Sequence, residues 1–181
     1  MNVVIRGALI SLAALYLYVA YLVTHPNVSA AYRDYYILKN TDLSIAERKK
    51  LPSLQPSRDY SHKDAAIGFD RWSGPEETHR WNDGKSARLL FRLEQAAVAQ
   101  APRQLGLRLM PHGTQRTRWR LNGTDLGERT LAAEAQLEFA LVPGLLRTGE
   151  NVLEIDMPDA HRPDSGDGRV LGLAFKSLRL E

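Results

Sequence analysis

An uncharged run of seventeen residues, Gly7–Val23, constrains this chain more than any other feature. At 1.5 Å per residue a helix of this length spans roughly 25 Å, and the turn before it extends the helix to about the thickness of a bilayer core. Three tyrosines, Tyr16, Tyr18 and Tyr21, lie toward the carboxyl end of the run, as in the aromatic belt at a membrane interface. The run predicts a transmembrane anchor over residues 1–25.

A secretory signal peptide is the alternative interpretation, with Val28-Ser29-Ala30 as a small-residue cleavage site. The run exceeds the roughly 7–15 apolar residues of a signal-peptide core, which favours an uncleaved anchor. Both interpretations export the rest of the chain, and Arg6 near the amino terminus favours an orientation with that terminus inside. We therefore expect a single-pass protein of the bacterial inner membrane with its carboxy-terminal domain in the periplasm.

Residues 26–63 are predicted to connect the anchor to this domain. Asp42–Lys50 is typical of a short helix that ends before Pro52, and Pro52 and Pro56 are typical of a linker. Residues 1–63 carry 8 basic and 4 acidic side chains, a surplus that suits the anionic headgroups of the bilayer as a partner.

From about Asp64 the hydrophobic pattern changes to a period of two, which is typical of half-buried strands. Asn122-Gly123 follows one such segment as a hairpin turn signal. The pattern predicts a mostly β domain over residues 64–181, a jelly-roll-like antiparallel β-sandwich carried on the N-terminal transmembrane helix. The residues expected to face inward are Ala87, Leu89, Phe91 and Leu93, then Leu105, Leu107 and Leu109, Thr117, Trp119 and Leu121, Leu137, Phe139 and Leu141, Leu153, Ile155 and Met157, and Leu171, Leu173 and Phe175.

Catalytic and cofactor motifs are absent from the sequence. The five histidines show no metal-ligand spacing, and there is no nucleophile elbow, phosphate-binding loop or dinucleotide fingerprint. Without cysteine the chain has neither a disulfide framework nor a thiolate metal site. We expect no cofactor and a non-catalytic protein, with a hydrolase or transferase of dispersed active site as one alternative.

A tryptophan-rich segment holds the candidate glycan site, formed by Trp72, Glu76, Arg80 and Trp81. An aromatic face can stack on a sugar ring while the carboxylate and the guanidinium bind its hydroxyls. The alternative is structural: the tryptophans close the end of the sandwich, and Glu76 pairs with Arg80 across one helical turn.

An aspartate-rich segment, residues 156–169, holds weak calcium candidates in Asp159, Asp164 and Asp167. The segment lacks the ligand spacing of a helix–loop–helix calcium site, and Arg162 and Arg169 are available as internal partners. A salt-bridged loop without metal is therefore the favoured interpretation.

Arginines predominate among the outward-facing strand positions and define a candidate anion- or partner-binding face. Residues 64–132 carry 11 basic and 8 acidic groups, whereas residues 133–181 carry 5 and 9, which predicts two electrically different sides. A cationic face suits phospholipid headgroups, an acidic glycan or an acidic partner protein, and solvated arginines without a ligand are the alternative. Export disfavours nucleic acid. The face comprises Arg88, Arg92, Arg108, Arg116, Arg118 and Arg120.

Four stretches of this domain resemble an uncharacterised bacterial extracytoplasmic β-sandwich module. They are the tryptophan motif at 72–87, the turn at 122–127, the start of a strand at 149–153 and the closing segment at 158–173. The module is appended to membrane proteins, often multi-span transferases of surface-polysaccharide synthesis or transfer. This chain departs from that arrangement in having a single short anchor, and the family offers no catalytic residue to carry over.

Together these features predict a membrane-anchored, non-catalytic periplasmic accessory domain. The resemblance implies that it binds a glycan or docks onto a membrane glycan-assembly or glycosyltransferase complex. The alternative is a structural subunit of another membrane complex that acts through its transmembrane helix.

Overall fold

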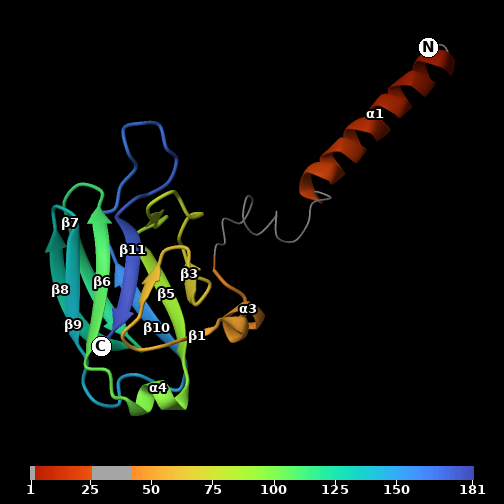
Figure 1. The fold of residues 1–181 in the computed structure, drawn as a ribbon. Coiled ribbons are helices and arrows are strands. Elements are labelled where there is room, and N and C mark those ends of the chain that lie inside the picture. The colour runs from red at the N-terminus through yellow and green to blue at the C-terminus, as the bar shows by residue number, and fades with distance from the viewer. Residues whose placement is uncertain (1–2, 26–41) are drawn as a thin grey trace. The chain divides into compact units, whose positions relative to one another are not determined.

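The computed structural model describes residues 3–25 and 42–181, which belong to two separate compact units. In the first unit, α1 (Val3–Thr24) is a single helix (Figure 1). Its segment Ile5–Thr24 has a mean hydropathy of 1.8 over its most apolar window, so its length and composition suit a membrane span and equally a signal sequence.

The second unit is a sandwich of two β-sheets (Figure 1), which confirms the predicted fold class. The six-stranded sheet has the order β1-β5-β10-β7-β8, with β3 also paired to β5, and the five-stranded sheet has the order β2-β11-β6-β9, with β4 also paired to β11. All pairs are antiparallel except β1 with β5. The bounds are β1 Ser53–Leu54, β2 Asp59–Ser61, β3 Ile67–Asp70, β4 Arg80–Trp81, β5 Ser86–Leu93, β6 Gln104–Pro111, β7 Gln115–Leu121, β8 Thr124–Leu131, β9 Ala135–Ala140, β10 Gly149–Asp156 and β11 Leu173–Leu180, with the short helix α4 Gln95–Ala99 between β5 and β6.

The core lies between the two sheets and is built from the alternating side chains that the sequence pattern identified. Trp119 on β7 is fully buried and its ring packs 5.2 Å from that of Phe139 on β9, so the two sheets meet there. The predicted hairpin joins β7 to β8, with Asn122 and Gly123 at φ of 51° and 83°, the positive values that a two-residue turn requires.

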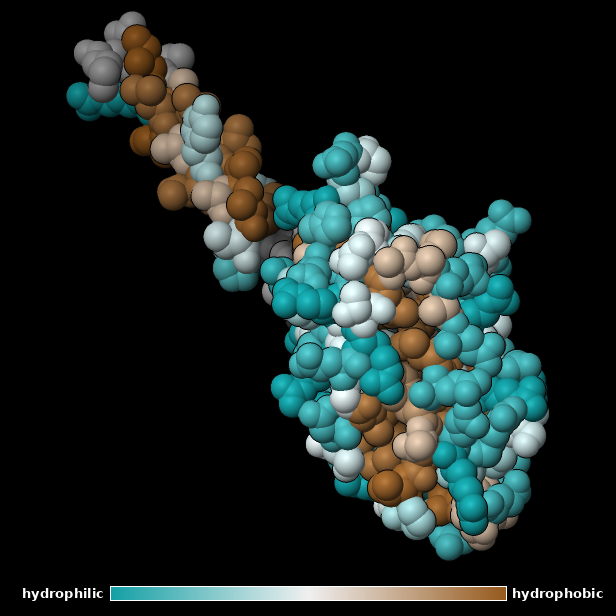
Figure 2. All heavy atoms as spheres, turned by 90° about the vertical axis from the view of Figure 1, so that its left-hand side faces the viewer, coloured by the Kyte–Doolittle hydropathy of each residue, from teal (hydrophilic) through white to brown (hydrophobic). Residues whose placement is uncertain are grey.

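One edge of the sandwich leaves part of this core visible. Figure 2 shows apolar side chains as a stripe between polar margins, on the side where the edge strands β8 and β9 lie. Leu126, Ala135 and Leu137 are only partly buried there, and the Arg129 guanidinium lies 5.1 Å from the ring centroid of Phe139. Arg129 of β8 therefore bridges to β9 of the other sheet through a cation–π contact.

The sandwich begins earlier than residue 64, which corrects the predicted boundary of the connector. Residues 53–61 supply β1 and β2, one strand to each sheet. Strands of two and three residues are too short to show a periodic pattern, so the sequence did not reveal them. Residues 26–41 of the predicted connector lie outside the described part of the chain.

The segment before β1 packs on the outside of the six-stranded sheet. Its helix α3 (Ile45–Lys50) starts with a capping box formed by Ser44 and Glu47. The carboxylate of Asp70, which has no exposed surface, accepts from the Leu43 amide and from Arg48 Nη2, both at 2.7 Å. This buried ion pair fixes residues 42–51 to the sheet.

Candidate functional site

Trp72 belongs to the core and is unavailable to a ligand. It is 3% exposed, and its ring packs edge-to-face against Phe69 and Phe175 at centroid distances of 6.1 and 6.0 Å. The indole Nε1 donates to the carbonyl oxygen of Arg88 at 3.0 Å. The burial of Trp72 agrees with the structural interpretation and leaves no ring face exposed for stacking on a sugar.

Arg80 does not pair with Glu76. Glu76 and Arg80 do not lie on one helical turn, because residues 80–81 form the extended strand β4. The side chains of Arg80 and Trp81 therefore point to opposite faces. The Arg80 guanidinium lies 3.9 Å from the ring centroid of Phe69, and burial lowers the pKa of Arg80. Glu76 instead contacts Arg169 Nη1 at 3.2 Å and His79 Nε2 at 3.3 Å.

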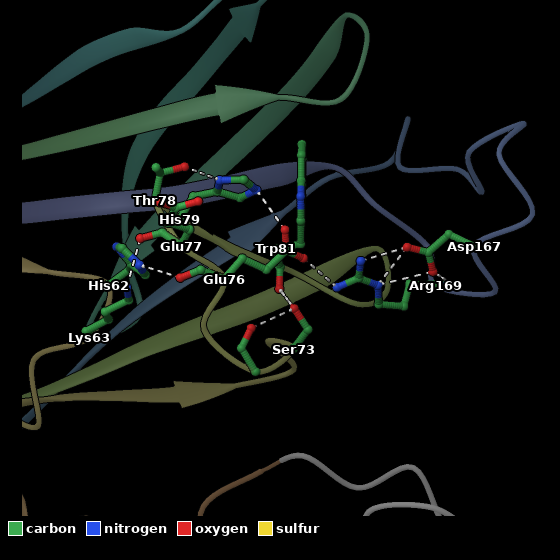
Figure 3. Close-up of polar contacts among 11 residues, drawn as sticks. His62, Lys63, Ser73, Glu76, Glu77, Thr78, His79, Trp81, Asp167 and Arg169 are labelled. Atoms are coloured by element: carbon green, nitrogen blue, oxygen red, sulfur yellow. Dashed lines mark hydrogen bonds and ion pairs between the residues drawn. The ribbon is translucent and has the colours of Figure 1, made fainter.

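Trp81 and Glu76 remain at the surface, in a group of side chains that we call the loop-end cluster: Glu76, His79, Trp81, His112 and Arg169. Figure 3 shows the indole of Trp81 edge-on, with His79 beside it and the Glu76–Arg169 pair near its base. The ring of Trp81 makes T-shaped contacts with both histidines, at centroid distances of 5.2 and 6.0 Å.

The loop between β10 and β11 completes the cluster by bringing in Arg169. Asp167 binds Arg169 through Oδ2 and Nη2 at 2.7 Å, and this hydrogen-bonded pairing lowers the pKa of Asp167 and raises that of Arg169. Both ions therefore stay charged at neutral pH. The cluster combines an aromatic ring, an anchored guanidinium and a carboxylate, which together offer an apolar surface, hydrogen-bond donors and acceptors.

The six arginines of the predicted cationic face do not share a face. Arg108 lies on β6 of the five-stranded sheet, and the other five lie on β5 and β7 of the six-stranded sheet. The acidic strand β10 lies between β5 and β7, so Glu154 stands opposite Arg88 on one side and Arg120 on the other. The prediction of two electrically different sides is wrong, because strands from the basic and acidic parts of the sequence alternate in one sheet.

Five of the six arginines are held in ion pairs. Within residues 42–181, Arg92 alone of the six has no ion pair. A face that is neutralised by its own carboxylates offers less to an external anion than the arginine count suggested. The pairs are Arg88 with Asp42 and Asp70 (2.6 and 3.1 Å), Arg108 with Glu134 (2.7 Å), Arg116 with Asp159 (2.8 Å), Arg118 with Asp125 (2.7 Å), and Arg120 with Glu154 and Asp156 (3.2 and 3.0 Å).

Two of the three calcium candidates, Asp159 and Asp167, are each bound by an arginine. Asp159 binds Arg116 through both carboxylate oxygens, which holds its pKa well below the usual range, and Asp167 binds Arg169. Asp164 is exposed in the same loop. Across residues 3–25 and 42–181, no three His, Asp or Glu side chains are grouped so as to hold a metal ion. The expected internal partner Arg169 is found for Asp167, whereas Asp159 pairs with Arg116 of β7 and not with a residue of its own loop.

Two features of the surface escaped the sequence analysis. Arg169 joins the loop-end cluster from 93 residues beyond Glu76, a distance that no local motif reveals. The outer face of the five-stranded sheet is hollowed around Gly106, where a residue without a side chain carries no chemical signal in the sequence. Both features become visible only when the strands are assembled into sheets.

Comparisons with known proteins address the fold. No protein-family model matches the sequence, and no curated protein matches it, so the resemblance to the extracytoplasmic module stays a prediction. Among solved structures, the carbohydrate-binding module CBM36 in complex with calcium and xylotriose is similar with a TM-score of 0.40 and 12% identity, over 68% of this chain and 99% of the module.

Two further structures show the range of sizes among the similar folds. The CBM36-1 domain of a multidomain xylanase from the hindgut metagenome of Trinervitermes trinervoides has a TM-score of 0.43 and 11% identity, over 68% of this chain and 95% of that domain. The acetyl xylan esterase Est2A from the rumen bacterium Butyrivibrio proteoclasticus has the same TM-score and identity over 68% of this chain. This chain spans about a third (32%) of the esterase. These likenesses describe the β-sandwich fold alone.

Proposed function

We propose that this chain is a membrane-anchored, non-catalytic accessory protein whose β-sandwich binds a glycan at the loop-end cluster. The observation that carries the proposal is the placement of Trp81. Trp72 and Trp119 are 3% and 0% exposed, whereas Trp81 is only half-buried and stands beside the ion pair of Glu76 and Arg169.

The chemistry of the cluster suits a sugar ring. An indole offers a broad apolar surface for the C–H face of a pyranose, and its amphipathic character suits a wet binding site. Arg169 donates and Glu76 accepts hydrogen bonds, so the pair can bind sugar hydroxyls through both of their hydrogen-bonding roles. The two charges of the pair cancel, which suits an uncharged ligand. Because Asp167 already fixes Arg169, little side-chain entropy is lost on binding.

The proposed location is the periplasmic side of the bacterial inner membrane, with α1 as the anchor. The uncharged run Gly7–Val23 within α1 suits the bilayer core, and the excess of basic residues over 1–63 suits anionic headgroups, so both support this placement. The proposed partner is a membrane enzyme of glycan assembly, onto which the domain docks. The sequence resemblance to an appendage of such enzymes supports that part.

Glycan-array binding of the full chain in detergent micelles, followed by calorimetric titration, tests the proposal. Trp81→Ala should lower the affinity for the bound glycan at least tenfold, and Trp81→Phe should keep part of it because an aromatic face remains. Glu128→Gln, on the outer face of the six-stranded sheet, is the matched control. Equal affinity of the wild-type protein and Trp81→Ala would contradict the proposed site.

A second candidate function is a structural subunit that acts through α1. Gly7 and Ser11 are four residues apart on one helical face, the spacing of small residues at which transmembrane helices pack closely. A membrane partner that co-purifies with the chain after residues 42–181 are deleted would favour this candidate. Loss of the partner on the same deletion would favour docking through the sandwich.

A further inference from the structure

The outer face of the five-stranded sheet carries a groove of about 240 Å³, which we call the sheet groove. Gly106 on β6 lies at its centre. The strand register places Glu138 of β9 on one side of Gly106 and Arg179 of β11 on the other, with Asp59 of β2 beyond Arg179. A row of four outward positions thus crosses the sheet, and only the position of Gly106 has no side chain.

The fold itself does not require a glycine there. A Cβ atom added to Gly106 would meet a single atom within 4 Å, the carbonyl oxygen of Arg179 at 3.8 Å, which is an ordinary van der Waals distance. The φ angle of Gly106 is not in the left-handed region, so other residues can adopt its backbone conformation. Glycine inside a strand costs about 0.5–1 kcal/mol relative to alanine. The sequence nevertheless has glycine at this position, and the missing side chain leaves an open hollow.

The walls of the groove are polar and nearly neutral. Arg179 Nη1 lies 3.4 Å from Asp59 Oδ2, and Arg179 Nε lies 2.5 Å from Glu181 Oε1. Arg108 donates through Nε to Glu134 and is 61% exposed, which leaves the rest of its guanidinium turned to solvent. Among the described residues that line the groove, none is aromatic. The lining residues are Asp59, Gln104, Gly106, Leu107, Arg108, Gln136, Glu138, Ser177, Arg179 and Glu181.

We infer that the sheet groove is a second binding site, which takes a short stretch of a neutral, polyhydroxylated chain. A hydroxyl both donates and accepts a hydrogen bond, which matches walls that alternate carboxylates with guanidiniums and amides. A ligand with net negative charge would meet three carboxylates, those of Asp59, Glu138 and Glu181, against two guanidiniums. This inference rests on the proposed function, since it assigns the same class of ligand to a different surface.

The size of the groove limits the ligand. From Gln104 to Arg108 the floor extends four residues along β6, roughly 13 Å at the rise of a strand. The volume is below the roughly 300–1,000 Å³ of pockets that enclose a small molecule. The groove therefore holds part of an extended chain against the sheet, by hydrogen bonds in place of ring stacking.

Filling the hollow tests the inference. In Gly106→Gln a side chain enters the empty position, and because the added Cβ meets no close contact, the unfolding midpoint should be no lower than that of the wild-type protein. Thr130→Gln, at an exposed position of β8 on the other sheet, is the matched control. The probes are cello-, xylo- and manno-oligosaccharides of four to six units, with oligogalacturonides as the anionic set, titrated calorimetrically into the full chain in detergent micelles. Gly106→Gln should lower the affinity for a neutral oligosaccharide at least tenfold, and Thr130→Gln should leave it unchanged.

The outcomes separate this inference from the proposed function. Loss of binding in Gly106→Gln with Trp81→Ala unaffected would support the sheet groove and overturn the loop-end cluster. The reverse pattern, or binding of the oligogalacturonides alone, would overturn the sheet groove and leave the loop-end cluster standing. A wild-type chain that binds none of the neutral probes would overturn the inference about the groove.

Discussion

Truncation of Trp72 should lower the free energy of unfolding of this domain, whereas truncation of Trp81 should change it little. Replacing a buried tryptophan by alanine removes its buried area and leaves a cavity, at a cost of about 3–5 kcal/mol. The structure places Trp72 above the lower end of that range, because two edge-to-face contacts, with Phe69 and Phe175, contribute about 0.5–1.5 kcal/mol each beyond burial. The carbonyl oxygen of Arg88 also loses its donor.

We therefore expect Trp72→Ala to lower the free energy of unfolding by about 4 kcal/mol, a large part of the roughly 5–15 kcal/mol typical of a domain. At a urea dependence of about 2 kcal/mol per molar, the midpoint falls by about 2 M. Trp72→Phe keeps the aromatic packing and loses the indole donor, so a loss of about 1–2 kcal/mol is expected. Trp81→Ala should change the midpoint little.

Urea titration of the full chain in detergent micelles, followed by near-ultraviolet circular dichroism, measures these differences. The fully buried Trp119 reports on the packing of the core in every variant. The reasoning is refuted if Trp72→Ala unfolds within 1 kcal/mol of the wild-type protein. It is equally refuted if Trp72→Ala abolishes glycan binding while the unfolding midpoint stays the same, since Trp72 would then reach the ligand.

Three further predictions concern the charges, the hairpin turn and the location. Arg116 depresses the pKa of Asp159 in the folded domain. The ion pair therefore stabilises the fold fully above about pH 4, the pKa range of an unfolded aspartate, and this stabilisation is lost as the pH falls through the pKa of the folded state. The midpoint of Asp159→Asn should lie below that of the wild-type protein at pH 7, and the gap should close on acidification; a constant gap would contradict this. Gly123→Ala places a Cβ at a φ of 83° and should lower the free energy of unfolding, measured by urea titration, by about 1 kcal/mol. An unchanged midpoint would contradict the turn geometry. A cysteine introduced at Thr130 is unique in a chain without cysteine, and a membrane-impermeant maleimide should label it in intact spheroplasts if the domain is periplasmic; labelling only after lysis would contradict the proposed location.

Hydrophobic alternation predicted the inward residues well because a half-buried strand must place every second side chain in the core. Leu105, Leu107 and Leu109 are all buried, as the pattern required. The same pattern does not say which sheet a strand joins. Arg108 faces outward as expected, but it was grouped with arginines of the other sheet, because the pattern did not show that β6 pairs with β9 and β11 and not with β5.

The error at Glu76 has a different cause. A spacing of four residues brings side chains together only on a helix, and residues 76–80 are not helical. The actual partner, Arg169, arrives through a loop far along the chain. Local spacing predicted that Glu76 would be paired, whereas the identity of its partner depends on how the sheets are connected.

The charge surplus in each part of the sequence predicted two electrically different sides, and this prediction was wrong for a related reason. Summing charges along a chain assumes that neighbours in sequence stay neighbours in space, whereas a sandwich places strands from distant segments side by side. The acidic strand β10 lies between the basic strands β5 and β7, and its Glu154 stands opposite Arg88 on one side and Arg120 on the other. A face whose charges are paired internally is a poor site for a free anion, so binding has to be sought where the surface is open. Trp81 at the loop end and the hollow at Gly106 both meet that condition, and both present mixed donors and acceptors in place of a single charge.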